Sequence, residues 1–205
     1  MPETPKSTKF LKKALFLDRD GVVINYIPYL SRPEQVQIPE GAGQALKNWQ
    51  NEDYLLIIIT NQSGVGRGRF TLEDVESVHE RVCEIYQPFG VEFDDIFLCP
   101  HHPDDNCQCR KPSGEMLVRA AEKHGISLAD SFFLGDAPSD LEAAIAAGCQ
   151  PLLVLTGRGQ TTFQEIDQYP VKIPVFDKIA DTVILLNHDP NYWPTAIAKI
   201  CLSHS

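Results

Sequence analysis

The sequence has few positive charges and no long apolar run. Its 205 residues include 18 Lys and Arg against 28 Asp and Glu, a formal net charge of −10. A protein that coats nucleic acid needs a net basic face, so that class is disfavoured, whereas a small anionic substrate needs only a local basic pocket. No apolar run reaches the roughly 18 residues of a membrane-spanning helix, and residues 1–13 lack the apolar core of a secretion signal. We therefore expect a cytoplasmic protein that binds neither membranes nor nucleic acid.

Composition and length indicate one ordinary globular domain. Hydrophobic residues make up 43% of the chain and charged residues 22%, close to the average for globular domains. We expect a flexible N-terminus over residues 1–12, a single domain over 13–187 and a C-terminal tail over 188–205. The domain is predicted to close with one helix over residues 179–186, and the protein is expected to be a monomer.

Short apolar runs alternate with helical patterns along the chain. Unbroken apolar runs typically form strands buried on both faces. Such runs occupy residues 14–18, 54–60, 95–98, 131–134 and 151–155. Apolar residues at helical spacing predict helices over residues 41–51, 71–86, 114–123 and 138–147, the second with Thr71 and Asp74 as a capping box. The alternation predicts a parallel sheet with right-handed crossovers.

Residues with chemical functions follow several of these runs. In open α/β sheets, ligands bind beyond the carboxyl ends of the strands, so these residues are expected to converge. They are two pairs of acids, one lysine and a Thr-Asn pair: Asp18, Asp20, Asp136, Asp140, Lys111, Thr60 and Asn61. Clustered carboxylates repel unless a hard cation lies among them, and Mg²⁺ prefers carboxylates together with waters and phosphate oxygens. Each motif alone is more often a simple turn, but together they indicate Mg²⁺-dependent phosphoryl transfer.

The order of these motifs resembles that of the haloacid dehalogenase-like (HAD) phosphatases. The matching segments are Asp18-Arg19-Asp20-Gly21, Thr60-Asn61-Gln62-Ser63, Lys111-Pro112 and Gly135-Asp136 followed by Asp140. The resemblance implies an α/β fold, a Rossmann-like three-layer sandwich with a mostly parallel central sheet and no large cap domain. It also implies that Asp18 is the nucleophile, that Asp20 is the general acid and then the base, and that Thr60 and Lys111 bind the phosphoryl group. By the same resemblance, Mg²⁺ is held by Asp18, Asp136 and the backbone carbonyl of Asp20, with Asp140 in support.

A second cluster of residues offers three thiolates and one imidazole, a tetrahedral ligand set that suits structural Zn²⁺. Its members are Cys99, His101, Cys107 and Cys109. The alternatives are unconnected thiols with a surface histidine, or His102 as the nitrogen ligand; the Cys-x-His spacing and the resemblance favour His101. We expect a small zinc-binding loop over residues 99–110, which places Arg110 and Lys111 over the substrate.

Within the HAD phosphatases, residues 13–159 look most like the heptose bisphosphate phosphatases, whose nearest relatives are the histidinol-phosphate phosphatases. The closer match lies in residues 60–71, 99–103, 107–112 and 155–159. It implies hydrolysis of the 7-phosphate of a small phosphorylated sugar, heptose 1,7-bisphosphate, in nucleotide-activated heptose synthesis. The short interval between His101 and Cys107 is instead typical of histidinol-phosphate phosphatases, and Ala137 stands where relatives often carry lysine. A non-catalytic zinc-containing binding domain is a third alternative.

The candidate substrate-binding residues lie next to these motifs and are Asn61, Ser63, Arg67 and Arg110. The segment 64–69 combines a flexible glycine backbone with two arginines, which suits a second substrate phosphate, but a plain glycine-rich loop with solvated charges fits it equally well. Arg110 is expected to contact the distal phosphate or the sugar hydroxyls. His79 and His124 lie in predicted helices and are expected at the surface, whereas Trp49 is expected in the core.

Overall fold

The computed structural model describes residues 11–187, so the tail over 188–205 and most of the expected flexible N-terminus lie outside the described residues. The described chain forms one six-stranded sheet in the order β3-β2-β1-β4-β5-β6, in which every pair of neighbours is parallel. The strands are β1 (Lys13–Leu17), β2 (Tyr54–Asn61), β3 (Asp95–Cys99), β4 (Phe132–Gly135), β5 (Gln150–Val154) and β6 (Val175–Phe176). The first five confirm the predicted runs, and β6 is too short to leave a periodic signal.

The chain reverses its direction across the sheet at β1. From β1 it proceeds outward through β2 to β3, and it then returns to the other side of β1 as β4. Leu17 consequently pairs with Ile58 on one side and with Leu134 on the other. A crevice forms at the carboxyl ends of the strands where the strand order reverses, which is where ligands bind in such sheets. The acids that follow β1 and β4 therefore meet there.

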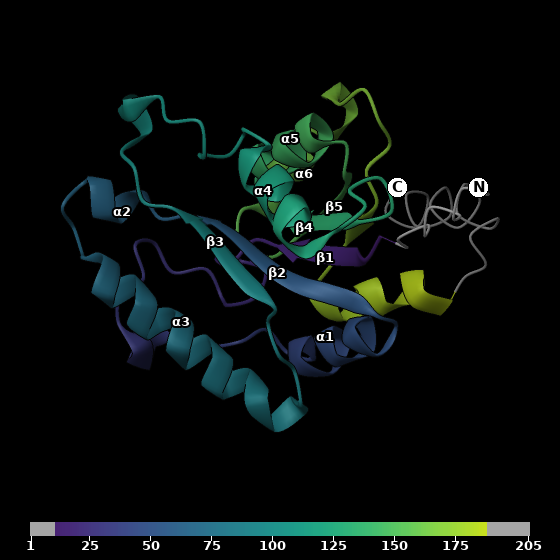
Figure 1. Ribbon diagram of the computed structural model, residues 1–205, viewed down its shortest axis with the longest axis horizontal. Coiled ribbons are helices and arrows are strands. Elements are labelled where there is room, and N and C mark those ends of the chain that lie inside the picture. The colour runs from purple at the N-terminus through teal and green to yellow at the C-terminus, as the bar shows by residue number, and fades with distance from the viewer. Residues whose placement is uncertain (1–10, 188–205) are drawn as a thin grey trace, which may run out of the picture.

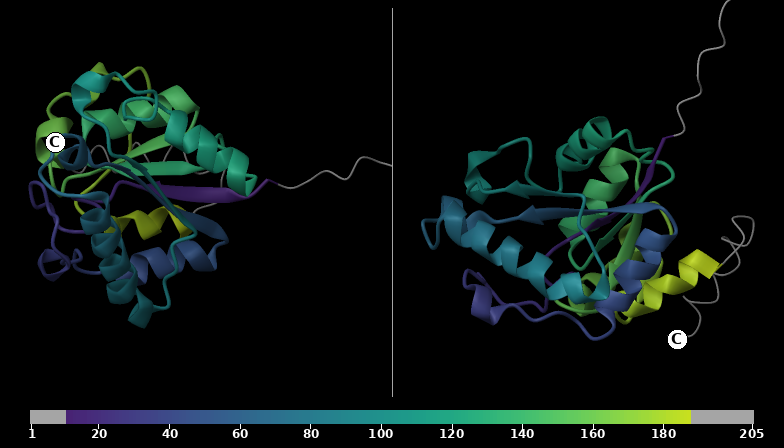
Figure 2. Two further views of the ribbon diagram at one scale, coloured as in Figure 1. Left: turned by 60° about the vertical axis from the view of Figure 1, so that its left-hand side comes forward. Right: turned by 60° about the horizontal axis from the view of Figure 1, so that its bottom comes forward.

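Helices cover both faces of the sheet (Figures 1 and 2). One face carries α1 (Ala42–Asn51), α3 (Leu72–Tyr86) and the 3-10 helix η5 (Ile179–Asn187), and the other carries α4 (Glu115–His124) and α5 (Pro138–Ala147). Neighbouring residues of each strand point to opposite faces, so Leu15 and Leu17 join the first core while Ala14 and Phe16 join the second. The three layers confirm the predicted sandwich, and no cap domain is inserted in the part that the structure describes.

The ends of the helices follow the sequence signals closely. Thr71 and Asp74 form the predicted capping box of α3, with the Thr71 N–H donating to Oδ2 of Asp74 at 2.8 Å.

Trp49 is buried as expected, and its Nε1 donates a hydrogen bond of 3.0 Å to Oγ1 of Thr182 on η5. The segment predicted as a helix over 179–186 is a 3-10 helix rather than an α-helix. Lys12 belongs to the expected flexible N-terminus, yet its N–H donates to the carbonyl oxygen of Gly125 at 2.9 Å.

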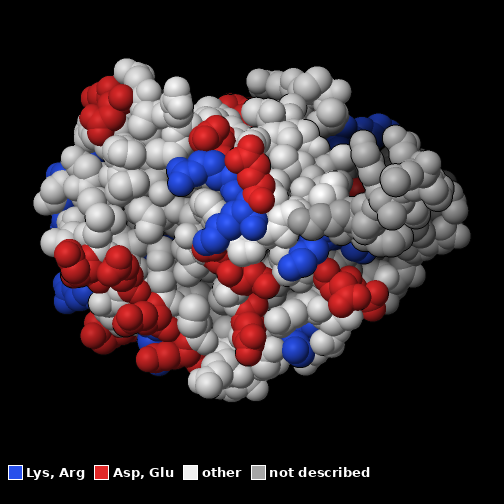
Figure 3. Space-filling view, in the orientation of Figure 1, with Lys and Arg blue, Asp and Glu red and all other residues white. Residues whose placement is uncertain are grey.

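Short elements complete the fold. They are the helices α2 (Ser63–Gly66) and α6 (Gly159–Phe163) and the 3-10 turns η1 (Pro33–Gln35), η2 (Gln87–Phe89), η3 (Pro103–Asp105) and η4 (Ile166–Gln168). The outer face of α3 carries exposed acidic residues, and Figure 3 shows acidic side chains gathered over this helix. Among the residues described, no helix is both long and apolar enough to cross a membrane.

Candidate active site

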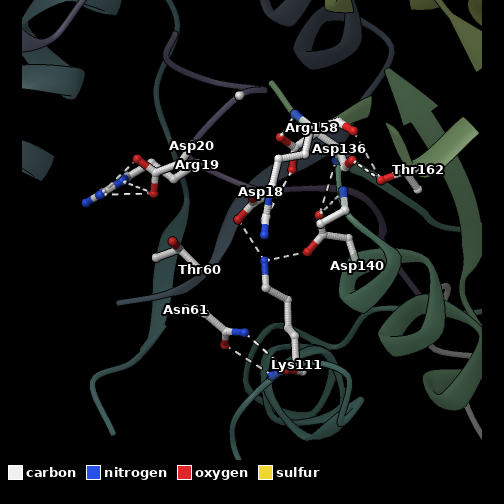
Figure 4. Close-up of polar contacts among 12 residues, drawn as sticks. Asp18, Arg19, Asp20, Thr60, Asn61, Lys111, Asp136, Asp140, Arg158 and Thr162 are labelled. Carbon is white, nitrogen blue, oxygen red and sulfur yellow. Dashed lines mark hydrogen bonds and ion pairs between the residues drawn. The ribbon is translucent and has the colours of Figure 1, made fainter. Parts of the chain in front are cut away.

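Lys111 lies at the centre of the site and bridges two carboxylates (Figure 4). Its Nζ lies 2.7 Å from Oδ1 of Asp18 and 2.8 Å from Oδ1 of Asp140, and it also donates to the carbonyl oxygen of Ile59 at 2.8 Å. Asp18 follows β1, and Asp140 lies in the first turn of α5. All three charged side chains are buried, so the sheet and α5 hold them together away from bulk water.

Asp136 follows β4, and its carboxylate is packed against backbone. Its Oδ2 accepts a hydrogen bond of 2.7 Å from the N–H of Arg158, and a Cβ on either Gly21 or Gly157 would clash with the same oxygen. Gly21 also has a φ of +97°, a backbone conformation that glycine adopts without steric cost. Glycine at these two positions thus lets the backbone close around the Asp136 carboxylate.

Three buried carboxylates share one ammonium group here. Asp18, Asp136 and Asp140 each offer an oxygen within 4.8 Å of the others. Lys111 balances one of their three negative charges, and Arg158, 3.6 Å from Oδ1 of Asp136 and half exposed, balances another only in part. Burial, reinforced by the neighbouring carboxylates and opposed by Lys111, raises the pKa of Asp18 to about 8. Burial and Asp140 raise the pKa of Asp136 to about 6, and Oδ1 of Asp136 is buried without a hydrogen-bond partner. A divalent cation would supply the missing charge and the missing partner, so this donor set fits Mg²⁺.

Thr60 and Asn61 end β2 and contact different neighbours. Asn61 donates through Nδ2 to the carbonyl oxygen of Lys111 and accepts through Oδ1 from the N–H of Lys111, both at 3.1 Å. This double contact fixes the backbone of Lys111 beside β2, so Asn61 holds the lysine in place, and its direct contact with substrate stays a prediction. Thr60 is buried, and its Oγ1 accepts a hydrogen bond of 2.8 Å from Nε2 of Gln62.

Asp20 lies in a separate polar cluster beside the Lys111 group. Nε and Nη2 of Arg19 donate to its two carboxylate oxygens, each at 3.1 Å, and Nε2 of Gln62 donates to Oδ2 at 2.9 Å. Nη1 of Arg19 lies 3.3 Å from Nε2 of His79 on α3. The expectation that His79 is a surface residue is therefore wrong, because it lies one turn after Val75 on the buried face of the helix.

The predicted zinc ligands lie together where β3 ends and the following loop folds back. Sγ of Cys107 lies 3.5 Å from Sγ of Cys99 and 3.6 Å from Sγ of Cys109, and Nδ1 of His101 lies 3.6 Å from Cys99 and 3.2 Å from Cys109. A tetrahedral ion with Zn–S distances of about 2.3 Å separates its ligand atoms by roughly 3.4–3.8 Å. Three of the four separations lie in this range and the separation of His101 from Cys109 is slightly shorter, so the chemistry and the spacing of the set suit zinc. The competing His102 points elsewhere, since its Nδ1 accepts a backbone hydrogen bond within the loop.

Helix α2 follows Thr60 and Asn61 and packs on the loop that carries the predicted zinc ligands. The N–H of Gly66 donates to the carbonyl oxygen of Pro100 at 2.8 Å, and a Cβ at this position would clash with the backbone of His102. The segment 64–69, expected as a flexible loop, thus begins as a helical turn packed tightly on the zinc loop. Near its end, the guanidinium of Arg69 stacks on the ring of Tyr29, 3.8 Å from the centroid.

A cleft of about 270 Å³ opens above the site. Three of the four predicted catalytic residues, Asp18, Asp20 and Lys111, line it, whereas the fourth, Thr60, is buried and lies outside the lining. Of the predicted substrate-binding residues, Asn61, Ser63 and Arg110 line it, whereas Arg67 is exposed and lies outside the lining. Nη1 of Arg110 is buried without a hydrogen-bond partner, so this cation has a donor to offer to an anionic ligand.

The fold brings several polar residues to the site that have no role in the predictions from the sequence. Besides Gln62 and the Arg19–His79 contact, Thr162 donates through Oγ1 to the carbonyl oxygen of Asp136 at 2.7 Å. Nη2 of Arg158 lies 3.6 Å from Oδ1 of Asp136, and its side chain faces the cleft. Arg158 lies shortly after the apolar run 151–155, so its place beyond a predicted strand could have identified it as a site residue. Thr162 lies in no such position, and the sequence does not indicate its role.

The structure is similar to solved HAD phosphatases. The D,D-heptose 1,7-bisphosphate phosphatase from B. bronchiseptica, solved with magnesium and phosphate, has a TM-score of 0.80 at 35% identity, over 85% of this chain and 97% of that chain. The phosphatase of the same name from Burkholderia thailandensis has a TM-score of 0.68 at 29% identity, over 87% of this chain and 100% of that one. Both cover most of the fold described above.

Curated sequences give the same result. A HAD-hydrolase-like family model matches residues 108–182. A D-glycero-beta-D-manno-heptose-1,7-bisphosphate 7-phosphatase from Pseudomonas putida is 41% identical over 171 residues, which make up 82% of this chain and 95% of the relative. One from Helicobacter pylori is 41% identical over 145 residues, 70% of this chain and 83% of the relative. The chain therefore belongs to the heptose bisphosphate phosphatase family of HAD-like phosphoric monoester hydrolases.

Proposed function

We propose that this protein hydrolyses the 7-phosphate of D-glycero-D-manno-heptose 1,7-bisphosphate through an aspartyl-phosphate intermediate. The buried group of Asp18, Lys111 and Asp140 at the base of an open cleft is the observation that supports the proposed phosphoryl transfer. The substrate is supported by relatives of this name, one of which is 41% identical to the chain over 171 residues. The histidinol-phosphate alternative is supported only by the short zinc loop.

The reaction proceeds in two displacements at phosphorus. First, a carboxylate oxygen of Asp18 bonds to phosphorus while the bond between phosphorus and the sugar oxygen breaks, and Asp20 gives its proton to that oxygen, which leaves as an alcohol. Second, Asp20, now a carboxylate, takes a proton from water as the water oxygen attacks phosphorus. The bond to Asp18 then breaks and phosphate leaves. Lys111 and Thr60 contact the phosphoryl oxygens and balance their charge.

Each metal has its own set of residues in this proposal. Mg²⁺ would be held by Asp18, Asp136 and the backbone carbonyl of Asp20, with Asp140 in support, and would supply positive charge to the phosphoryl oxygens. Zn²⁺ would be held by the four ligands of the loop 99–110, which leave no open position, so its role is structural. A solved relative that contains magnesium and phosphate supports the first assignment. A cytoplasmic location and a monomeric state stay predictions.

The cleft lining suggests how the rest of the substrate is held. Arg110, with its unpaired Nη1, would bind the 1-phosphate or the sugar hydroxyls, and Ser63 would donate from the adjoining wall. Arg67 lies outside the lining and is the weakest of the candidates. Because no cap domain covers the cleft in the part of the chain that the structure describes, these loop residues are proposed to supply the specificity.

The test is a panel of substrates assayed with Mg²⁺ for the wild-type protein and for Asp18→Asn. We expect kcat/KM to be highest for the heptose bisphosphate, and we expect Asp18→Asn or removal of Mg²⁺ to abolish turnover of every substrate. A preference for histidinol phosphate would overturn the substrate and leave the chemistry intact. Full activity in Asp18→Asn would overturn the chemistry, and a wild-type protein inactive on the whole panel would favour the non-catalytic zinc-containing domain.

A further inference from the structure

A line of buried polar side chains connects helix α3 to the acid of the proposed reaction. Nε2 of His79 lies 3.3 Å from Nη1 of Arg19, and the other two nitrogens of this guanidinium lie 3.1 Å from the carboxylate oxygens of Asp20. His79 is 7% exposed and Arg19 is 1% exposed. The guanidinium is therefore held away from bulk water, with an imidazole on one side and a carboxylate on the other.

The chemistry of this contact defines the role of each group. A guanidinium carries only hydrogen-bond donors, so Nε2 of His79 must be the acceptor. Burial and the positive charge of Arg19 lower the pKa of His79 to about 4, although Asp20 opposes this shift. The imidazole is thus neutral at neutral pH and keeps a lone pair directed at Arg19. A leucine at this position would fill similar space but would offer Arg19 no acceptor.

Arg19 in turn controls the orientation of Asp20. Its planar fork contacts both carboxylate oxygens, and a bidentate contact of this kind defines the plane of the carboxylate. The side chain of Asp20 is 19% exposed and faces the cleft, so hydrogen bonds help to set its rotamer, and Arg19 supplies two of them. Gln62 adds one donor from the side of Thr60. The direction in which Asp20 can transfer a proton thus depends on how firmly Arg19 is held.

We propose that His79 is a positioning residue for proton transfer: it fixes Arg19, and Arg19 sets the orientation in which Asp20 meets the leaving oxygen. The inference rests on the proposed function, in which Asp20 is the general acid. It extends the active site through the sheet-facing side of α3 to a residue that belongs to none of the four motifs.

The test compares two leaving groups. Heptose 1,7-bisphosphate must release an alcohol, which needs a proton, whereas p-nitrophenyl phosphate releases a stable anion, which needs none. The ratio kcat/KM reports the steps up to departure of the leaving group. Because general acid catalysis contributes roughly 10²–10⁴-fold, we expect His79→Leu to lose about tenfold in kcat/KM for the bisphosphate but less than about twofold for p-nitrophenyl phosphate. Asp20→Asn removes the general acid itself and therefore shows the full loss of general acid catalysis, about 100-fold or more in kcat/KM for the bisphosphate.

Two further variants separate positioning from folding. His79→Gln keeps an acceptor for Arg19, so we expect it to recover most of the activity on the bisphosphate. His124→Leu removes a histidine that contacts Asp95 at 2.7 Å outside the cleft lining, and it should leave both substrates unchanged. Equal losses on the two substrates in His79→Leu, or equal losses in His79→Gln and His79→Leu, would overturn the inference. If the wild type instead shows no preference for the bisphosphate, the proposed substrate fails, and the same comparison applies to whichever sugar phosphate it hydrolyses.

Discussion

Replacing Lys111 with methionine tests the electrostatics of the site most directly. The Nζ of Lys111 lies 2.7 and 2.8 Å from two buried carboxylate oxygens, and at an effective dielectric constant of 20 each contact corresponds to an attraction of about 6 kcal/mol. The cost of dehydrating the charges offsets most of this attraction. Removing one partner of a buried ion pair nevertheless costs about 3–5 kcal/mol, because the remaining charges lose their compensation. We expect Lys111→Met to lower the free energy of unfolding by that amount at pH 9, above the raised pKa of Asp18 and without divalent metal.

The measurement is urea unfolding at pH 9 and at pH 5, with Lys178→Met as the matched control. Lys178 is an exposed partner of Glu40 at 3.2 Å, so its loss should cost no more than about 1 kcal/mol. The deficit of Lys111→Met should shrink at pH 5, because the carboxyl groups of Asp18 and Asp136, whose pKa values are raised, then carry protons and need no cation. A deficit equal to that of the control, or one that does not depend on pH, would refute this reasoning.

Three other perturbations have equally specific outcomes. For the wild type without divalent metal, the raised pKa values of Asp18 and Asp136 mean that the folded state binds extra protons, so the free energy of unfolding should fall as pH rises from 3.8 towards about 8, and added Mg²⁺ should flatten this slope in urea titrations. Cys107→Ser should lower zinc content, measured by elemental analysis, and kcat together; full activity in a zinc-free variant would show that the metal does not hold the loop. Gly66→Ala should likewise weaken zinc retention against a chelator, because its Cβ would clash with the backbone of His102.

The meeting of motifs that are distant in sequence was the part of the site that could be predicted from the sequence. Asp18 and Asp136 end apolar runs, and parallel strands present their carboxyl ends at one edge, so their meeting requires only that β1 and β4 be neighbours. The grouping of Cys99, His101, Cys107 and Cys109 was predictable for a similar reason, because a Cys-x-His pair and a Cys-x-Cys pair flank a turn. In both cases a local pattern and a general rule of topology suffice.

The partners of individual side chains could not be predicted from the sequence, because they depend on packing between elements that are distant in sequence. Nothing in the motif around Asn61 indicates that its amide would hold the backbone of Lys111. His79 shares the helical spacing of the buried valines of α3, so its burial was readable, but its contact with Arg19 depends on how α3 lies against the sheet. The packing of α2 on the zinc loop likewise depends on tertiary contacts of Gly66.

Cys99 belongs at once to the edge of the sheet and to the proposed zinc site. It is the last residue of β3, the outermost strand on its side, and it pairs with Asn61 of β2. If zinc is bound there as proposed, its loss would release the anchor of a strand that lies at the edge of the sheet in the described part of the chain, and edge strands are prone to pairing with another chain. A cell short of zinc would on this basis lose the protein to aggregation as well as to inactivity, so metal supply would govern how much of it accumulates.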